Sequence, residues 1–144
     1  MRVRCVAILQ GGRRGGRDIS DQPNGPVQIG REYPVLGIVC QAETGVAYSI
    51  LREDVYPALA PSLLTAEMFE VVNPTIPSSW VVVDWYGNGR VIGLEPKAWA
   101  DDVNDEGSFF ERKVNGDGSL IPVFVHEVER IYAEEGFAPP ARRA

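Results

Sequence analysis

The clearest structural signal in the chain is the segment WVVVDWYGNGRVIGL, residues 80–94. β-Branched and aromatic residues dominate its two halves, 80–86 and 90–94, as is typical of β-strands. The connecting Gly87-Asn88-Gly89 contains Asn-Gly, the pair that a type I′ hairpin turn prefers because both residues tolerate a positive φ. The segment therefore predicts an antiparallel β-hairpin.

Further strands are expected on the N-terminal side of this hairpin. Alternating and apolar patterns predict strands at Arg2–Leu9, Tyr33–Gln41 and Val46–Arg52, and a short strand at Val27–Ile29. Residues 42–45 have the length of a hairpin connection and end in a glycine, which suits a positive φ. This part of the chain is therefore expected to be mostly β-structure.

A helical turn with Thr65 as its N-cap is expected at residues 65–69, and two helices are expected after the hairpin. Pro96 is suited to open a short helix that runs to about Asp102, with Trp99 as its apolar anchor. A longer helix is expected at Pro122–Glu135, where apolar residues recur on one stripe, and Gly136 stands where helices commonly end. The polar residues between the two helices give no clear pattern.

Strands followed by helices imply an α+β fold. We expect a small twisted antiparallel sheet, or an SH3-like or split barrel, with C-terminal helices packed on it. The length of 144 residues suits one domain, which we place at residues 1–137. Residues 10–26, with five Gly and two Pro, are expected to form a flexible Gly/Arg loop, and residues 138–144 a disordered tail.

Composition excludes several classes of protein. The net charge is −6, from 14 Lys and Arg against 20 Asp and Glu, which argues against a general nucleic-acid binder. No apolar run approaches the roughly 20 residues of a membrane helix. The apolar stretch at residues 5–9 is shorter than the roughly 7–15 residues of a secretory signal. We therefore expect a cytoplasmic protein without a membrane partner.

Motifs that bind phosphate or metal are incomplete in this chain. The glycines of residues 11–18 are spaced as in a phosphate-binding loop, but Arg17 and Asp18 replace the required Lys and Ser or Thr. Residues 102–113 begin like a calcium-binding loop and end in Lys113 instead of Glu. The only histidine, His126, lacks the second histidine of a zinc-protease helix. No metal or cofactor is expected.

Two alternatives remain open on the residues themselves. Asp84 and Glu95 lie on the two strands of the predicted hairpin, so a small enzyme or a ligand-binding β-barrel would use them as a carboxylate pair. Arg13, Arg14 and Arg17 resemble an Arg-Gly-Gly tract, so a phage or housekeeping protein would contact nucleic acid through this loop.

Charge and aromatic residues gather in the C-terminal half. Residues 1–31 contain six Arg and two Asp, whereas residues 95–135 contain 11 acidic and four basic residues. Aromatic anchors beside carboxylates are typical of a surface that recognises a basic protein. The expected partner-binding residues combine the two types: Trp85, Tyr86, Glu95, Trp99, Asp101, Asp102, Asp105 and Glu106.

Several motifs in residues 33–105 point in the same direction. They are Tyr33-Pro-Val-Leu-Gly-Ile, Tyr48-Ser-Ile-Leu-Arg-Glu-Asp, Phe69-Glu-Val-Val-Asn-Pro-Thr-Ile-Pro-Ser-Ser-Trp-Val and Glu95-Pro-Lys-Ala-Trp. Together they resemble a family of small bacterial proteins associated with the immunity proteins of toxin–immunity systems. The resemblance implies a non-enzymatic cytoplasmic protein that binds and blocks a cognate toxin, and it brings no catalytic residues. It does not indicate the oligomeric state.

Overall fold

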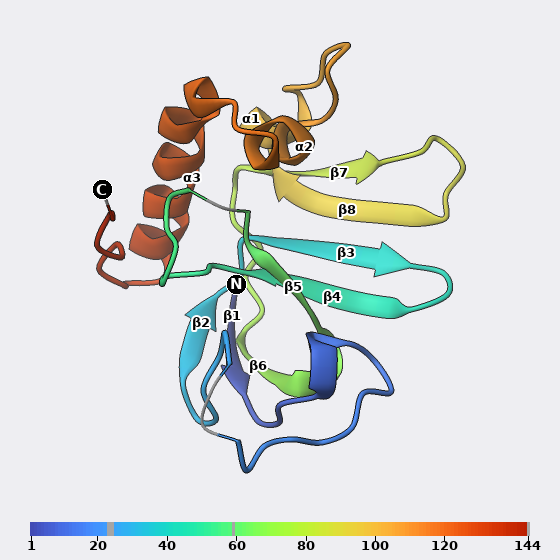
Figure 1. Ribbon diagram of the computed structural model, residues 1–144, viewed down its shortest axis with the longest axis vertical. Coiled ribbons are helices and arrows are strands. Elements are labelled where there is room, and N and C mark those ends of the chain that lie inside the picture. Colours follow the sequence, from blue (N-terminus) through green and yellow to red (C-terminus); the bar gives the residue numbers. More distant parts are fainter. Residues whose placement is uncertain (23–24, 59, 144) are drawn as a thin grey trace.

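The chain folds into two antiparallel sheets with helices at the C-terminal end, an α+β architecture as expected (Figure 1). The computed structural model describes residues 1–22, 25–58 and 60–143. The strands are β1 Arg2–Cys5, β2 Glu32–Pro34, β3 Gly37–Gln41, β4 Gly45–Ile50, β5 Ser62–Thr65, β6 Phe69–Asn73, β7 Trp80–Asp84 and β8 Val91–Pro96. The helices are α1 Lys97–Ala100, α2 Phe109–Val114 and α3 Ile121–Glu134, with short 3-10 turns at Gln10–Gly12, Ala66–Met68 and Gly118–Leu120.

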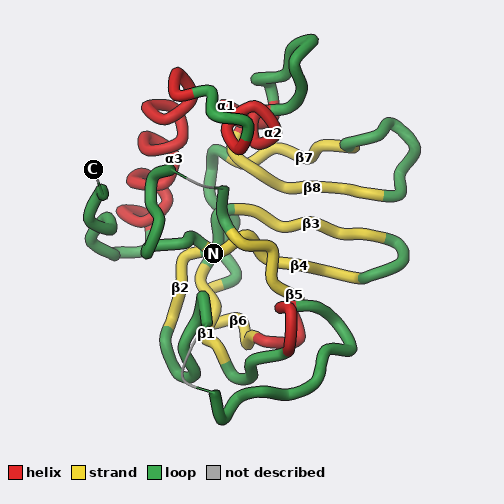
Figure 2. The backbone as a smooth tube through the Cα atoms, in the orientation of Figure 1, coloured by secondary structure: helices red, strands yellow, loops and turns green. Residues whose placement is uncertain are grey.

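The chain passes between the two sheets after β2, after β5 and after β6. The smaller sheet has the order β2-β1-β6 and the larger has the order β5-β4-β3-β8-β7 (Figure 2). The chain crosses from one to the other between Pro34 and Gly37, so the single strand expected at 33–41 is two strands. Val35 and Leu36 are fully buried at the crossing. Their backbone N–H groups donate to the Met1 and Ser49 carbonyls, so these buried backbone donors are hydrogen-bonded.

The hairpin predicted from residues 80–94 is confirmed as β7 and β8, but its loop is not a type I′ turn. Gly87 and Gly89 have positive φ, whereas no described non-glycine residue does, so Asn88 lacks the required conformation. The longer loop is held instead by side chains. The Asp84 carboxylate accepts the Gly89 N–H at 2.9 Å, and the Asn88 side chain accepts the Arg90 N–H at 3.0 Å.

Other boundaries also differ from expectation. Val27–Ile29 is not a strand, because the chain turns at Gly30 (φ 82°) and only the Val27 side chain enters the core. β1 ends at Cys5, well before Leu9. β5 was missing from the sequence prediction, and so was α2, whose start carries a complete capping box between Ser108 and Glu111.

The loop expected to be flexible, residues 10–26, makes several contacts with the body. The Ile19 N–H bonds the Ile8 carbonyl at 2.8 Å, and the Ser20 hydroxyl accepts the Ile8 N–H at 3.0 Å. Residues 23–24 of this loop lie outside the described residues, as does residue 144 of the expected tail. Within that tail, Arg142 forms an ion pair with Glu129.

Two hydrophobic clusters hold these layers together. The first fills the space between the small sheet and the inner face of the large sheet, around Val3, Tyr33, Ile50 and Leu64. The second lies among the helices, where Trp99, Tyr56, Phe109 and the expected apolar stripe of α3 are buried. The predicted role of Trp99 as an anchor and the predicted C-terminal helix are thus confirmed.

Every helix in the described part of the chain falls short of the length and apolar character needed to cross a bilayer.

A lysine is buried in the helical cluster without a carboxylate partner among the described residues. The Lys113 ammonium donates to the Pro57 and Ala58 carbonyls at 2.7 and 2.9 Å and lies over the Phe124 ring. Lys113 is 4% exposed, and burial lowers its pKa to about 8. Because the unfolded lysine keeps its ordinary pKa, the unfolded chain binds more protons between pH 8 and about 10.5. This residue therefore makes stability rise with pH over that window.

We expect Lys113→Met to remove this pH dependence. The difference in free energy of unfolding between the wild type and the variant should grow by about 2 kcal/mol in favour of the wild type from pH 7.5 to pH 9.5. Urea unfolding followed by circular dichroism at both pH values measures this difference in free energy. The contributions of titrating groups that both proteins share cancel in the difference. A difference that stays constant with pH would contradict the assignment.

Candidate functional site

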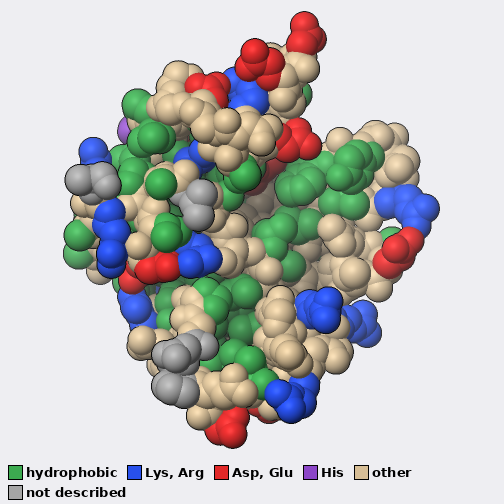
Figure 3. All heavy atoms as spheres, in the orientation of Figure 1, with side chains coloured by type: hydrophobic (Ala, Val, Ile, Leu, Met, Phe, Trp, Pro, Cys, Tyr) green, Lys and Arg blue, Asp and Glu red, His purple; other side chains and the backbone are tan. Residues whose placement is uncertain are grey.

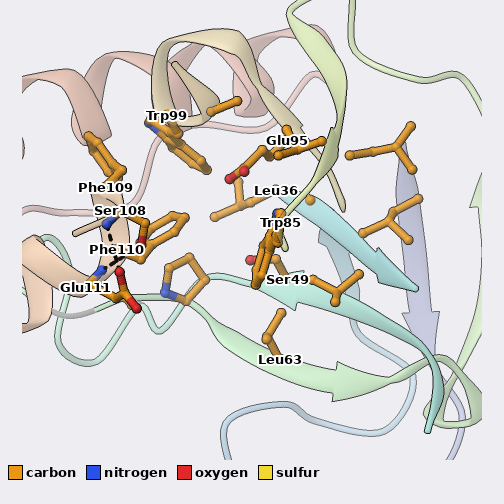
Figure 4. Close-up of a pocket in the computed structure, with 18 of the residues that line it drawn as sticks. Leu36, Ser49, Leu63, Trp85, Glu95, Trp99, Ser108, Phe109, Phe110 and Glu111 are labelled. Carbon is orange, nitrogen blue, oxygen red and sulfur yellow. Dashed lines mark hydrogen bonds between the residues drawn. The ribbon is translucent and has the colours of Figure 1, made fainter. Parts of the chain in front are cut away.

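A pocket of about 500 Å³ lies on the outer face of the large sheet, beneath α1, α2 and the loop between them (Figure 4). Strand register explains its floor. Gly37, Ser49 and Leu63 are paired across β3, β4 and β5, so their side chains share one face of the sheet. The residues between them, such as Tyr48 and Leu64, point to the opposite face and fill the core. The pocket is therefore the uncovered side of a sheet whose other side is packed.

The Trp85 indole forms one wall. A Cβ atom built on Gly93 would lie 2.6 Å from the Trp85 Nε1, so the absence of a side chain at Gly93 lets the ring lie against the sheet. The backbone N–H of Trp85 donates to the Val91 carbonyl at 3.1 Å, which fixes the backbone just beyond β7. One face of the indole is thus supported by the strand, and Trp85 remains partly exposed.

Glu95 is the ionisable residue directed into the pocket. It extends from β8, opposite Val81, and its carboxylate points between the rings of Trp99 and Trp85 in Figure 4. Burial raises the pKa of Glu95 above its usual range, while hydrogen bonding from the Trp85 side chain acts in the opposite direction. The ion pairs among described residues do not include Glu95, and the nearby Lys97 is engaged by Asp101.

A second carboxylate, Glu111, lines the pocket but is already used. Its Oε2 accepts the Ser108 N–H at 2.8 Å, and the Ser108 hydroxyl accepts the Glu111 N–H in return. These hydrogen bonds lower the pKa of Glu111. The carboxylate therefore serves as the cap of α2, and a Cβ atom on Gly107 would meet it at 2.8 Å.

The aromatic residues expected at a partner surface do come together here. Trp85, Tyr86, Glu95 and Trp99 all line the pocket, and Tyr86 is 71% exposed. Trp99 requires a correction, because it is only 2% exposed and stacks between Phe109 and Phe124 with ring centroids at 5.8 and 5.4 Å. Its ring faces belong to the core, and only its edge reaches the pocket, so Trp99 does not offer its ring to a partner.

The acidic residues divide into paired and unpaired ones. Asp101 forms an ion pair with Lys97, and Asp102 with Arg112, whereas Asp105 and Glu106 are exposed and absent from the ion pairs of the described residues. All four lie in the loop 101–108, which projects from the molecule beside the pocket (Figure 1). In Figure 3 acidic side chains mark this projecting end, next to a hollow flanked by hydrophobic side chains.

The rest of the acidic segment does not form the single face that the charge of residues 95–135 suggested. Glu127 pairs with Arg130 and Glu129 with Arg142, both on the α3 side of the molecule. Glu135 is buried against the Met1 ammonium at 2.5 Å. These pairings link residues distant in sequence or use local neighbours, so a count of charges along the chain does not reveal them.

Asp84 and Glu95 do not form a carboxylate pair. Asp84 lies opposite Ile92 and Glu95 opposite Val81, so the two carboxylates leave opposite faces of the hairpin. Asp84 is exposed and bonded to the loop at Gly89. The part of the chain that is described contains no group of three or more His, Cys, Asp or Glu positioned to hold a metal ion.

The Arg/Gly loop lies elsewhere on the molecule. Arg14 forms an ion pair with Glu67 at 3.3 Å, while Arg13 and Arg17 are exposed. None of the three lines the pocket. The aromatic and acidic site and the arginine-rich loop are therefore separate surfaces.

Two parts of the pocket were missed by sequence reasoning. Leu63 belongs to the unpredicted strand β5, and Phe110 to the unpredicted helix α2. The Ser-x-x-Glu spacing at 108–111 was a usable signal for the start of α2, because this spacing is the signature of a capping box. Leu63 carried no comparable signal.

Comparison of the chain with protein-family models, with curated proteins and with solved structures finds no match. The site is therefore interpreted from its own chemistry. An apolar cavity with one carboxyl group and partly exposed aromatic walls is suited to bind an apolar group with a polar end. Glu95 has no second carboxylate beside it with which to share acid–base work, since Glu111 is committed to its cap.

Proposed function

We propose that the protein is a non-enzymatic binding protein that neutralises a cognate basic protein toxin, as immunity-type inhibitors do. The contact surface would consist of the pocket and the loop 101–108. The observation that carries this proposal is an apolar rim that continues the apolar cavity onto the surface. Leu63, Tyr86 and Val103 are exposed large hydrophobic residues that line the same pocket. Exposed apolar residues gathered around a cavity are typical of interaction sites.

The rim favours a protein partner over a small molecule. A small ligand would fill the cavity and leave the rim exposed, because Leu63, Tyr86 and Val103 come from three separate segments around its mouth. A protein surface would cover the cavity and the rim together. Trp and Tyr are also the residue types that most often anchor protein interfaces, and Trp85 and Tyr86 stand side by side here.

The charge of the neighbouring loop supports a basic partner. Asp105 and Glu106 are exposed on the loop that also contributes Val103 and Gly107 to the pocket. Complementary charge beside an apolar contact speeds association and selects the partner, and carboxylates are suited to occupy a cleft that binds phosphate. The acidic loop would therefore steer a basic toxin toward the pocket.

The toxin candidate to test is the product of the adjoining gene, co-expressed with this protein in a bacterial host. We expect that product to arrest growth alone and the wild-type protein to restore growth by forming a complex. A neighbouring product that is harmless, or toxic but not bound by this protein, would overturn the proposal. Growth curves and size-exclusion chromatography of the purified pair provide the two measurements.

We expect the double variant Asp105→Asn/Glu106→Gln to associate about tenfold more slowly with that toxin at low salt, because steering is lost. The difference should shrink at high salt, where surface charges are screened. Stopped-flow or biosensor kinetics measures it. The matched control is Asp21→Asn/Glu134→Gln, which removes the same charge from exposed positions outside the pocket. Equal effects from both double variants would contradict a specific role of the loop.

A further inference from the structure

We infer that the pocket takes an aliphatic ammonium group, namely a lysine side chain of the bound partner, with its alkyl stem on the apolar walls and its ammonium at the Glu95 carboxylate. The inference rests on the proposed function only for the source of the lysine. The chemistry it needs lies in this chain alone and is tested on the isolated protein.

Glu95 has no cationic partner among the described residues. Its carboxylate is directed into an apolar cavity, and no ion pair of the described residues includes it. The charged groups on the elements around it are occupied, since Lys97 and Asp101 pair with each other on the α1 side and Glu111 caps α2. Burying a carboxylate without a counter-ion is costly even when it accepts a hydrogen bond from the Trp85 side chain, and a cation entering the pocket would reduce that cost.

The size and lining of the cavity also suit a lysine side chain. At about 500 Å³ it falls within the roughly 300–1,000 Å³ typical of ligand pockets and exceeds the needs of a single polar head group. Leu36, Val39 and Val83 line the way to Glu95 with aliphatic groups. A lysine stem is a flexible aliphatic chain that packs on apolar surface while its ammonium seeks polar contacts.

The aromatic wall of the pocket favours a cation as well. Trp85 is supported on one side by Gly93 and is partly exposed, so its ring is available to a cation in the pocket. Tryptophan is the best aromatic partner for an ammonium group. The same wall is neutral toward an alcohol and gives no attraction to a carboxylate. Glu95 and Trp85 together therefore favour the ammonium over both.

The probes for this inference are n-hexylamine, 1-hexanol and hexanoate, titrated into the purified protein at pH 7.5 and followed by NMR chemical shifts of pocket residues. We expect hexylamine to bind about tenfold more tightly than hexanol, because a charge-assisted hydrogen bond is added to the same apolar contact. Hexanoate should bind more weakly than either, because Glu95 repels it. Equal affinities for hexylamine and hexanol would overturn the inference.

Two variants separate the role of Glu95 from that of charge in general. Glu95→Gln should remove most of the preference for hexylamine over hexanol, leave only the contribution of Trp85, and leave hexanol binding unchanged. Glu111→Gln is the matched control, because it neutralises the other pocket-lining carboxylate while Gln also completes a capping box. This control should keep the tenfold preference. A loss of preference in Glu111→Gln but not in Glu95→Gln would contradict the assignment.

A titration of the wild type gives a readout that needs no variant. Because burial raises the pKa of Glu95, its carboxyl group takes up a proton above the ordinary range as the pH falls. The preference for hexylamine should therefore decline with acid before an ordinary glutamate is protonated, while hexanol affinity stays constant. A tenfold preference that is undiminished at pH 3.5 would exclude the carboxylate as its cause.

The two proposals fail separately. Toxin binding with no preference for hexylamine would remove the lysine subsite and keep the binding function. A clear preference for hexylamine, with no toxin bound, would keep the ammonium site and remove the toxin as its source.

Discussion

Glu135→Ala is expected to lower the free energy of unfolding by about 3–5 kcal/mol. The Glu135 side chain is almost fully buried and accepts the Met1 ammonium at 2.5 Å and both hydrogen bonds from the Asn73 amide at 3.1 Å. Arg2 lies 3.8 Å from the same carboxylate. Removing Glu135 would leave a buried ammonium without a counter-charge and detach the end of α3 from β1 and β6.

Chemical denaturation of the purified variant measures this loss. The matched control is Glu134→Ala, which removes an exposed carboxylate from the preceding position and should change stability by no more than about 0.5 kcal/mol. A loss below about 1 kcal/mol for Glu135→Ala would show that the carboxylate does not join the helix to the sheet.

Leu63→Asp is expected to weaken toxin binding by about 30-fold or more. Leu63 lies on the edge strand β5 at the mouth of the pocket, and an aspartate there would be buried in an apolar contact without a partner. Isothermal titration calorimetry with the adjoining-gene product measures the change. The expected loss is large because one substitution both removes apolar contact and introduces a carboxylate that must be dehydrated.

Val71→Asp provides the control for this variant. Leu63 is 48% exposed and Val71 is 47% exposed, and both lie on edge strands, but Val71 belongs to the small sheet and does not line the pocket. We expect Val71→Asp to bind as the wild type does. Equal losses from both variants would indicate a general effect on folding rather than a contact at the pocket.

Local sequence signals predicted the parts of the fold that are local in nature. The β7–β8 and β3–β4 hairpins have short glycine-containing connections, and α3 has a long apolar stripe that ends at Gly136. The division of residues 33–41 into two strands depends on which partners the strands find, and no local pattern encodes that choice. The turn at Asn88 was mispredicted because Asp84 holds a longer loop by accepting the Gly89 N–H.

The candidate site was predictable where one hairpin supplies it. Trp85, Tyr86 and Glu95 were selected from the sequence because they flank a recognisable turn and lie near acidic residues. Leu63 and Phe110 reach the same pocket from distant segments, so only the tertiary structure brings them there. The strand register places the side chains of Asp84 and Glu95 on opposite faces of the hairpin, although both residues belong to its two strands.

The pocket face is the proposed contact surface for a toxin. Amide hydrogen–deuterium exchange, compared between the free protein and its complex with the adjoining-gene product, tests this claim most directly. We predict new protection in residues 60–64, 85–95 and 103–111, and unchanged exchange in β1, β6 and residues 10–17. Protection confined to residues 10–17, or spread evenly over both sheets, would contradict the claim.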